Sequence, residues 1–247
     1  FMYFFFLTAA GLFSVLPLIY AVTTSFKPID ELLIFPPTFF VKRPTTVNYI
    51  TLPNLLSNLQ VPLSRYIFNS LFVTIVTTAI YIVISAMAAF VLTQGKGNRL
   101  IAALFVIVQF SLLYNSYTLA IPQYLVFSKL RLIDTYLVYI LPYLPSALGV
   151  FLMKQYMESS IPVSLVEAAR IDGAGYSRIF FQIAIPMVKP CIMTLMLFGF
   201  RDAWAIAPGE TIFTESLKTL PGAVSQITAA GIARAGSSMA ITVILMI

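Results

Sequence analysis

The sequence predicts an all-α protein built as a polytopic bundle of transmembrane helices. Of its 247 residues, 60% are hydrophobic and only 10% are charged, and the mean hydropathy is +0.93. A soluble domain mixes polar and apolar residues at short period, and a transmembrane barrel alternates them, so neither class fits. Four stretches hold no charged residue, and each is about as long as the roughly 20 residues that cross a membrane as a helix. These stretches are 1–26, 66–95, 100–128 and 135–153.

From these stretches and the chain ends we expect six membrane helices, the last of them truncated. Met239–Ile247 is a short apolar run, about 13 Å of helix, whereas the hydrocarbon core is about 30 Å thick. We therefore expect the sixth helix to continue beyond the sequence. No basic segment precedes the apolar run at Phe1, so we expect no cleavable signal peptide and a longer parent protein. The expected helices cover Phe1–Ser25, Tyr66–Thr93, Leu100–Thr118, Thr135–Tyr156, Met187–Ile206 and the stretch from Ser237.

The connections between these helices differ in composition. Residues 26–64 hold six prolines, which forbid a long helix and favour extended or turn structure. Gln94–Arg99 reads QGKGNR, a tight polar turn, and residues 207–236 form a second connection that contains Gly and Pro. Pro142 and Pro145 are expected to bend the fourth helix.

Composition excludes several kinds of chemistry. The single cysteine, Cys191, cannot form an internal disulfide, and a chain without histidine has no His-based triad, metal site or proton relay. The net charge of +6 comes from basic residues that flank helices without clustering, which disfavours nucleic-acid binding. The GKGN stretch at 95–98 lacks the spacing of a phosphate-binding loop, so we do not expect ATP hydrolysis or another enzymatic activity. The two predicted membrane sides carry equal net charge, so charge alone does not set the orientation.

A charged loop, residues 158–186, interrupts the apolar pattern with the stretch LVEAARIDGAGYSRIFFQIAIP. Ser160 can cap a first helix over 163–172, in which Pro162 suits an early position, and Gly173 can end it in the left-handed conformation. An amphipathic segment follows, and Pro186 closes it and opens the fifth helix. Its apolar residues recur at three- and four-residue steps: Tyr176, Ile179, Phe180 and Ile183.

Two interpretations of the charged loop stay open on physical grounds. An amphipathic hairpin lying on the bilayer explains the apolar stripe. A docking element explains in addition why Ala168 and Ala169 stand beside Glu167, because small side chains permit close backbone approach and a carboxylate fixes orientation.

The charged loop resembles the EAA loop of permease subunits of ABC importers. That pattern is Glu-Ala-Ala, three residues, Gly, nine residues, Ile, one residue and Leu-Pro, and here Ile185 replaces the leucine. The resemblance implies that the loop is cytoplasmic, fits a cleft on the ATP-hydrolysing subunit and transmits its motion to the membrane helices. It assigns to this coupling loop Glu167, Ala168, Ala169, Asp172, Gly173, Ile183 and Pro186.

The resemblance extends over nearly the whole chain. SFKPIDELLIFPPTFF, YIFNSLFVT, ARIDGA and FRDAWAIAPGETIFTESLKTLP are similar to segments of carbohydrate-importing, maltose-type permeases. This implies one transmembrane permease domain, 1–247, with the fold of type I ABC importer permeases, in the bacterial inner membrane. The family often has Trp-Asn where this chain has Trp204-Ala205, so a role tied to that asparagine is in doubt.

The resemblance also implies the partners of the chain. They are a second permease subunit in a heterodimer, two ABC ATPase subunits, and an extracellular or periplasmic solute-binding protein that delivers a carbohydrate, expected to be an oligosaccharide. ATP and Mg belong to the ATPase subunits, and this chain needs no cofactor of its own.

Polar residues in the predicted helices are candidates for the substrate pathway. Arg201 lies about 15 residues, roughly 22 Å, beyond Pro186, and ionisable groups at that depth mark a pathway or a partner unless they snorkel at the outer interface. A tryptophan can stack on a sugar ring or belong to an interfacial belt, and smaller polar groups can match sugar hydroxyls or join helices. The candidates are Asn69, Tyr114, Asn115, Arg201, Asp202 and Trp204, with Tyr117 and Gln123 as further polar groups.

Two rival functions make different predictions. A secondary transporter or channel for a small polar solute, working without an ATPase, predicts intramembrane acids or histidines for ion coupling, and the first four predicted helices contain no such charge. An intramembrane enzyme needs histidine or paired intramembrane carboxylates, and the sequence offers neither.

Overall fold

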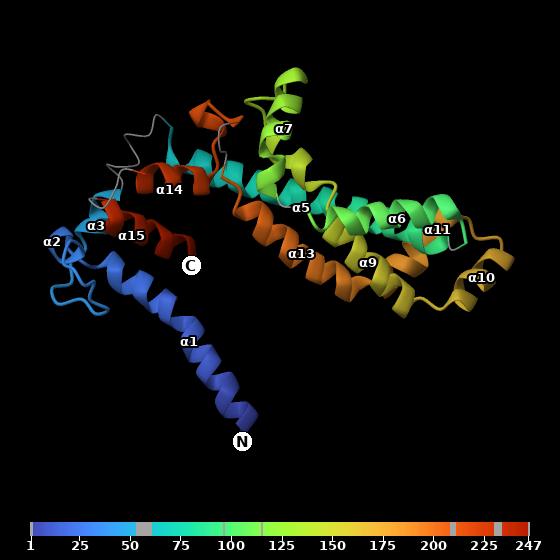
Figure 1. Ribbon diagram of the computed structural model, residues 1–247, viewed down its shortest axis with the longest axis horizontal. Helices are drawn as coiled ribbons and strands as arrows, with labels where there is room; N and C mark the ends of the chain where they lie inside the picture. Colours follow the sequence, from blue (N-terminus) through green and yellow to red (C-terminus); the bar gives the residue numbers. More distant parts are fainter. Residues whose placement is uncertain are drawn as a thin grey trace. The chain divides into compact units, whose positions relative to one another are not determined.

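The computed structural model describes residues 2–52, 61–95, 97–114, 116–207, 211–229 and 234–246. Every regular element in these ranges is a helix (Figure 1), which confirms the predicted all-α class. The helices form two compact units: unit 1 is residues 1–67 with 218–247, and unit 2 is residues 68–217. The long helix α5 (Leu63–Gln94) contributes its first residues to unit 1 and the rest to unit 2.

Unit 1 is built around the contact between α1 (Met2–Ser25) and α15 (Ala235–Met246), and α14 (Leu220–Ala229) packs on α15. Helix α1 contains no charged residue, and most of its large apolar side chains are exposed. An exposed apolar surface of this extent is what a lipid-facing helix presents.

Buried polar groups hold the connection that follows α1. The Lys27 ammonium donates a hydrogen bond to the Thr38 carbonyl, and the buried Glu31 carboxylate accepts N–H bonds from Lys42 (2.9 Å) and Arg43 (3.4 Å). The segment between these groups is extended or turn structure, as its prolines predict. Two short helices that the sequence did not predict flank it, α2 (Ile29–Leu32) and α3 (Val47–Ile50).

Unit 2 is organised along α5, whose 32 residues give about 48 Å of helix and exceed the roughly 30 Å of a hydrocarbon core. Helix α6 contacts α9, and α9 contacts α13. These helices and α7 have the bounds α6 (Arg99–Ser111), α7 (Ser116–Lys129), α9 (Ala147–Ser160) and α13 (Lys189–Trp204).

Helices α1 and α5 are each long and apolar enough to span a bilayer, and two bent helix pairs raise the candidate spans in the described residues to four. The predicted third helix, 100–118, is wrong as a single helix, because α6 ends at Ser111 and α7 begins at Ser116. The Ser111 hydroxyl donates to the Val108 carbonyl, a local bond of the kind that competes with helix continuation.

The predicted fourth and fifth helices also differ from single straight helices. Pro142 lies in η1 (Leu141–Tyr143), and η1 with α8 (Leu137–Ile140) meets α9 at 42°, so the predicted bend is confirmed. Helix α13 begins only at Lys189, after a 78° bend from the preceding segment.

The core of unit 2 beside the charged loop is apolar and closely packed. Tyr81 of α5, Met153 of α9 and Leu195 of α13 are all buried in it. Two glycines permit this packing, since a Cβ at Gly149 would lie 2.5 Å, and one at Gly199 2.8 Å, from the Tyr81 ring. Helices α9 and α13 therefore approach α5 through residues without a side chain. A second buried cluster of unit 2 contains Val73, Phe127, Val138, Tyr139 and Ile212.

Candidate functional site

The first half of the charged loop is the helix α10 (Val163–Ile171). Pro162 occupies its N-cap position, and no side chain caps the helix. The predicted Ser160 cap is wrong, because α9 continues through Ser160 and the chain turns only at Ile161, whose N–H bonds the Met157 carbonyl at 3.0 Å.

The predicted stop at Gly173 is confirmed, with φ at +80°. The Gly173 N–H donates to the Arg170 carbonyl (3.0 Å) and the Ala174 N–H to the Ala169 carbonyl (2.9 Å). These two bonds form a Schellman motif, which requires a residue in the left-handed region that glycine reaches at low cost.

The second half of the loop consists of α11 (Tyr176–Ile179), the π-helix η2 (Phe180–Ala184) and α12 (Ile185–Met187). Within the predicted stripe, Ile179 and Phe180 are buried and Ile183 packs on the same core, while Tyr176 is exposed. The predicted break at Pro186 is wrong by two residues, since Pro186 is the second residue of α12 and the turn falls at Val188. The first turn of a helix accepts proline because its N–H would have no partner there.

The coupling-loop candidates divide between two faces (Figure 1 shows α10 at one end of unit 2). Val166 is buried in the core, and Ala169 and Ile183 pack against it. The remaining candidates are exposed: Glu167, Ala168, Asp172, Gly173 and Pro186. The loop thus presents a carboxylate and a small side chain outward while its apolar side is fixed.

Two basic residues that the sequence analysis did not single out hold the loop and α9 in place. The Arg170 guanidinium donates to the Gln94 side-chain oxygen (3.2 Å) and lies 4.7 Å from the Tyr176 ring centroid. Lys154 pairs with Glu158 at 2.8 Å, lies 4.0 Å from the ring centroid of Phe105 on α6, and is only 11% exposed. The signal in the sequence for the Lys154–Glu158 pair was the i,i+4 spacing of opposite charges directly after the charge-free stretch 135–153.

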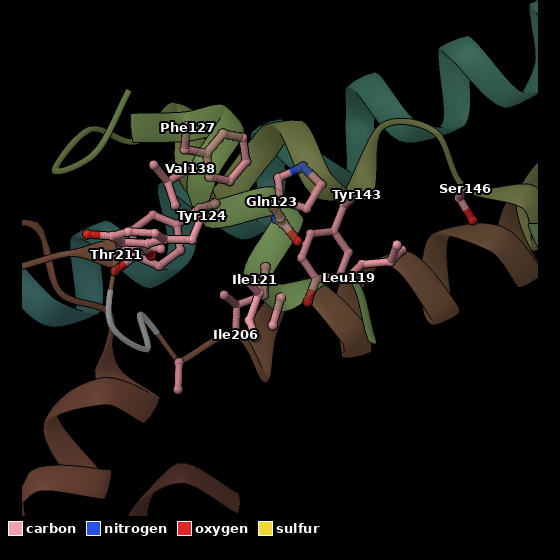
Figure 2. Close-up of a pocket in the computed structure, with 14 residues that line it drawn as sticks. Leu119, Ile121, Gln123, Tyr124, Phe127, Val138, Tyr143, Ser146, Ile206 and Thr211 are labelled. Carbon is pink, nitrogen blue, oxygen red and sulfur yellow. The ribbon is translucent and has the colours of Figure 1, made fainter. Parts of the chain in front are cut away.

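Far from α10 along α5, unit 2 contains a cavity of about 760 Å³ (Figure 2). Its walls come from α7, α8, η1 and the chain on either side of Ser146 and Ile206. Of the polar groups named from the sequence whose side chains the structure describes, only Gln123 lines it. Tyr124 and Tyr143, which also line it, were missed because aromatic residues are common throughout the chain.

Of the six predicted substrate-pathway residues, none that the structure describes lines this cavity. Tyr114 is exposed, and Asn115 lies outside the described residues. Arg201 donates two hydrogen bonds to Asp202 (2.9 and 3.0 Å), and the Trp204 ring stacks on Phe200 at 5.8 Å.

Asn69 is fully buried and joins elements of unit 2. Its amide nitrogen donates to the Ser216 carbonyl (2.8 Å), and its oxygen accepts the Tyr136 hydroxyl (2.7 Å). This geometry is that of a residue that connects helices, the alternative considered for it from sequence.

Asp134, which the sequence analysis passed over, holds the segment after α13. Its carboxylate accepts N–H bonds from Phe213 (3.1 Å) and Thr214 (2.8 Å) and the Thr214 hydroxyl bond. The bond from the Thr214 hydroxyl has the largest effect and lowers the pKa of Asp134 below its usual value. Burial opposes it, and the two backbone N–H bonds lower the pKa further. The Tyr139 hydroxyl also donates to the Leu217 carbonyl (3.2 Å).

Comparison with known proteins agrees with this architecture. The sulfoquinovosyl glycerol transport system permease protein SmoH of Agrobacterium fabrum (strain C58) is 33% identical over 197 residues, which cover 78% of this chain. They cover 65% of SmoH, so the matched part spans less than two thirds of that protein. The arabinooligosaccharides transport system permease protein AraQ of Halalkalibacterium halodurans is 28% identical over 254 residues, covering 95% of this chain and 85% of AraQ.

The fold also matches a solved structure. A chain in the crystal structure of a bacterial ABC transporter involved in the import of the acidic polysaccharide alginate superposes with a TM-score of 0.78 at 19% identity. The superposition covers 99% of this chain and 91% of the other. Residues 68–247, which include the whole charged loop, match one family across more than half of the sequence. The chain therefore belongs to the family of binding-protein-dependent transport system inner membrane components.

Proposed function

We propose that this chain is the transmembrane permease subunit of an ATP-driven ABC importer that carries a carbohydrate, an oligosaccharide, across the bacterial inner membrane. The observation that carries the proposal is the geometry of the charged loop. Glu167 and Ala168 are exposed on a short helix, Gly173 ends that helix, and Val166 anchors it in the core. A membrane chain that draws on a separate ATPase needs such an outward contact.

Close packing supports a role of the loop in transmitting motion. Val166, Ile179 and Phe180 of the loop share one buried cluster with Met153 of α9 and Leu195 of α13. Protein interiors are dense and little compressible, so a displacement of α10 by an ATPase is passed to these helices rather than absorbed.

The names of the relatives support a carbohydrate as the substrate. SmoH is named for a sulfoquinovosyl glycerol transport system and AraQ for one that carries arabinooligosaccharides. Both names describe sugars or glycosides.

We further propose the assembly that such a subunit requires. Residues 1–247 act as one permease domain with a cytoplasmic coupling loop at 158–186, beside a second, different permease subunit. Two ATPase subunits bind ATP and Mg, and an extracellular or periplasmic binding protein delivers the sugar. Tyr114, Asn115, Arg201, Asp202 and Trp204 stay proposed contributors to the pathway, whereas the bonds of Asn69 favour a role in joining elements.

The coupling proposal is tested by Gly173→Val in the reconstituted complex. Valine in the left-handed region costs roughly 1–2 kcal/mol and opens the end of α10, although a Cβ meets nothing within 4 Å. We expect uptake to be abolished while the chain stays in the membrane. Gly175→Val is the matched control, because Gly175 is equally exposed but has φ −71°, which valine adopts. Normal uptake by Gly173→Val contradicts the coupling role.

The substrate proposal is tested by ATPase stimulation of the same complex. A panel of sugars, each presented with its binding protein, should include at least one that raises ATP hydrolysis and enters the vesicles. Uptake driven by an ion gradient without ATP contradicts the proposal.

A further inference from the structure

The cavity of unit 2 has the size of a ligand site. Its volume of about 760 Å³ lies within the roughly 300–1,000 Å³ of small-molecule pockets. Apolar side chains such as Leu119, Ile121 and Phe127 form most of its wall. The polar lining residues are Gln123, Tyr124, Tyr139, Tyr143, Ser146 and Thr211.

Three of these polar side chains are available to a ligand. Within the described part of the chain, the Gln123 amide and the hydroxyls of Tyr124 and Tyr143 make no hydrogen bond to another residue. By contrast, Tyr139 donates to the Leu217 carbonyl. Figure 2 shows Gln123 and Tyr143 in the middle of the lining, between Phe127 and Ser146. An amide and two phenol hydroxyls supply both donors and acceptors, the set that sugar hydroxyls match.

The charge of the cavity lining favours uncharged ligands over anionic ones. Among the lining residues that the structure describes, none is an acid, a lysine or an arginine. The nearby Arg201 guanidinium does not line the cavity and is already paired with Asp202. A uronate or a sulfonate placed here would lose its hydration without gaining a cation, a cost that burial of an unpaired charge always carries.

We propose that this cavity is a subsite for uncharged sugar units, with Gln123, Tyr124 and Tyr143 as its specificity-determining residues. The proposal rests on the proposed function and deepens it, because it names neutral oligosaccharides as the substrate class. A lipid acyl chain is a poorer occupant, since it would cover these polar groups and leave them unpaired.

Accessibility of the cavity is tested by cysteine labelling in the complete reconstituted complex. Cys191, the single cysteine, is buried, so the parent chain is the unlabelled control. Gln123→Cys should react with a membrane-impermeant maleimide, and arabinotriose, maltotriose or xylotriose with its binding protein should slow that reaction. Gln109→Cys, on an exposed position of α6, should show no protection. Access to Gln123→Cys that appears only after delipidation indicates a lipid and overturns the subsite.

Transport kinetics of single variants provide a second test of the subsite. Loss of one hydrogen bond should raise KM for the transported trisaccharide about two- to tenfold in Tyr143→Phe and in Gln123→Leu, with kcat unchanged. Tyr143→Phe should also lose part of the preference for that sugar over its deoxy analogues, which a purely structural defect would not remove. Gln109→Leu is the matched control and should keep the parent KM.

The outcomes separate the two proposals. Transport of a neutral trisaccharide with unchanged KM in both variants, or without protection of Gln123→Cys, overturns the subsite and leaves the proposed function standing. Transport of trigalacturonate in preference to every neutral sugar overturns the neutral class. If the parent complex transports no sugar of the panel, the proposed function itself fails.

Discussion

The two ends of unit 2 are held by different forces. At the loop end, which we define as the charged loop and the buried cluster around Tyr81, apolar side chains from six helical segments pack on one another. At the clasp end, Asp134, Asn69 and Tyr139 hold the segment Thr211–Leu217 by hydrogen bonds. The stability of the loop end therefore depends on side-chain volume. The stability of the clasp end depends on charge and on the direction of hydrogen bonds.

This difference matters for a subunit that must transmit a displacement. Apolar contacts are non-directional, so packed elements can shift together without losing a particular bond. Hydrogen bonds weaken steeply when their angle changes, so they keep a segment in one place. We expect the loop end to respond to changes in side-chain volume and the clasp end to protonation.

The largest expected effect comes from added volume at the loop end. In Gly149→Val the new Cβ would lie 2.5 Å from the Tyr81 ring and 2.6 Å from the Ser85 hydroxyl, and both residues are buried. Overpacking of this kind costs about 1–3 kcal/mol, and we expect the upper part of that range because two helices must separate. Thermal denaturation of the detergent-solubilised chain measures the loss.

Gly11→Val in α1 is the matched control, because a Cβ at Gly11 meets nothing within 4 Å. It should leave the melting temperature nearly unchanged. Equal melting temperatures for Gly149→Val and the parent would show that the loop end is not limited by volume.

Lys154 tests the contrast between the two ends directly, because it is a charged residue inside the apolar loop end. Lys154→Met removes the 2.8 Å bond to Glu158 and the contact with the Phe105 ring, and leaves a carboxylate that is only 22% exposed. A hydrogen bond to a charged group contributes about 1.5–3 kcal/mol, and we expect about 2 kcal/mol of destabilisation. Chemical denaturation of both forms measures it.

The double variant Lys154→Met/Glu158→Met separates pairing from packing. Because it also removes the carboxylate whose bond to Lys154 was lost, it should recover most of the stability that Lys154→Met loses. A double variant as unstable as the sum of the single changes would show that the pair makes no coupled contribution.

The stop of the first loop helix at Gly173 could be predicted from sequence, and the contacts of the clasp end could not. The motif from Glu167 to Gly173 is local, and glycine at a positive φ follows from its neighbours in the chain. The clasp joins Asp134 to Thr214 and Asn69 to Ser216, pairs about 80 and 150 residues apart, and no local period marks such partners. Asn69 was noticed as a polar residue in an apolar helix, but its partners depend on tertiary structure.

The errors within the loop have local physical causes. Ser160 and Pro186 are each good terminators by residue type, yet α9 continues through Ser160 and α12 includes Pro186 in its first turn. The π-helix Phe180–Ala184 adds a wider turn that shifts the break to Val188. The spacing of apolar residues alone does not distinguish a π-helical turn from an α-helical one over five residues.

The smallest expected effect tests the clasp end by pH. The pKa of Asp134 is lowered by the bonds from Thr214 and Phe213, so the ionised form stabilises the fold. This contribution is fully present above the unfolded pKa near 3.9 and is lost as the pH falls through the lower folded pKa. The site is partly exposed, so we expect Asp134→Asn to cost about 0.5–1 kcal/mol at pH 7. Denaturation midpoints at pH 7 and in strong acid measure it.

The difference between parent and Asp134→Asn should therefore shrink as the solution becomes more acidic, because protonation removes from the parent what the substitution has already removed. Asp172→Asn, on the exposed end of α10, should show no such convergence. A destabilisation by Asp134→Asn that is equal at both pH values would mean that the loss of a hydrogen-bond acceptor, rather than the loss of the negative charge, weakens the hold on Thr211–Leu217. Protonation would then not distinguish the clasp end from the loop end, and the contrast between them would not stand.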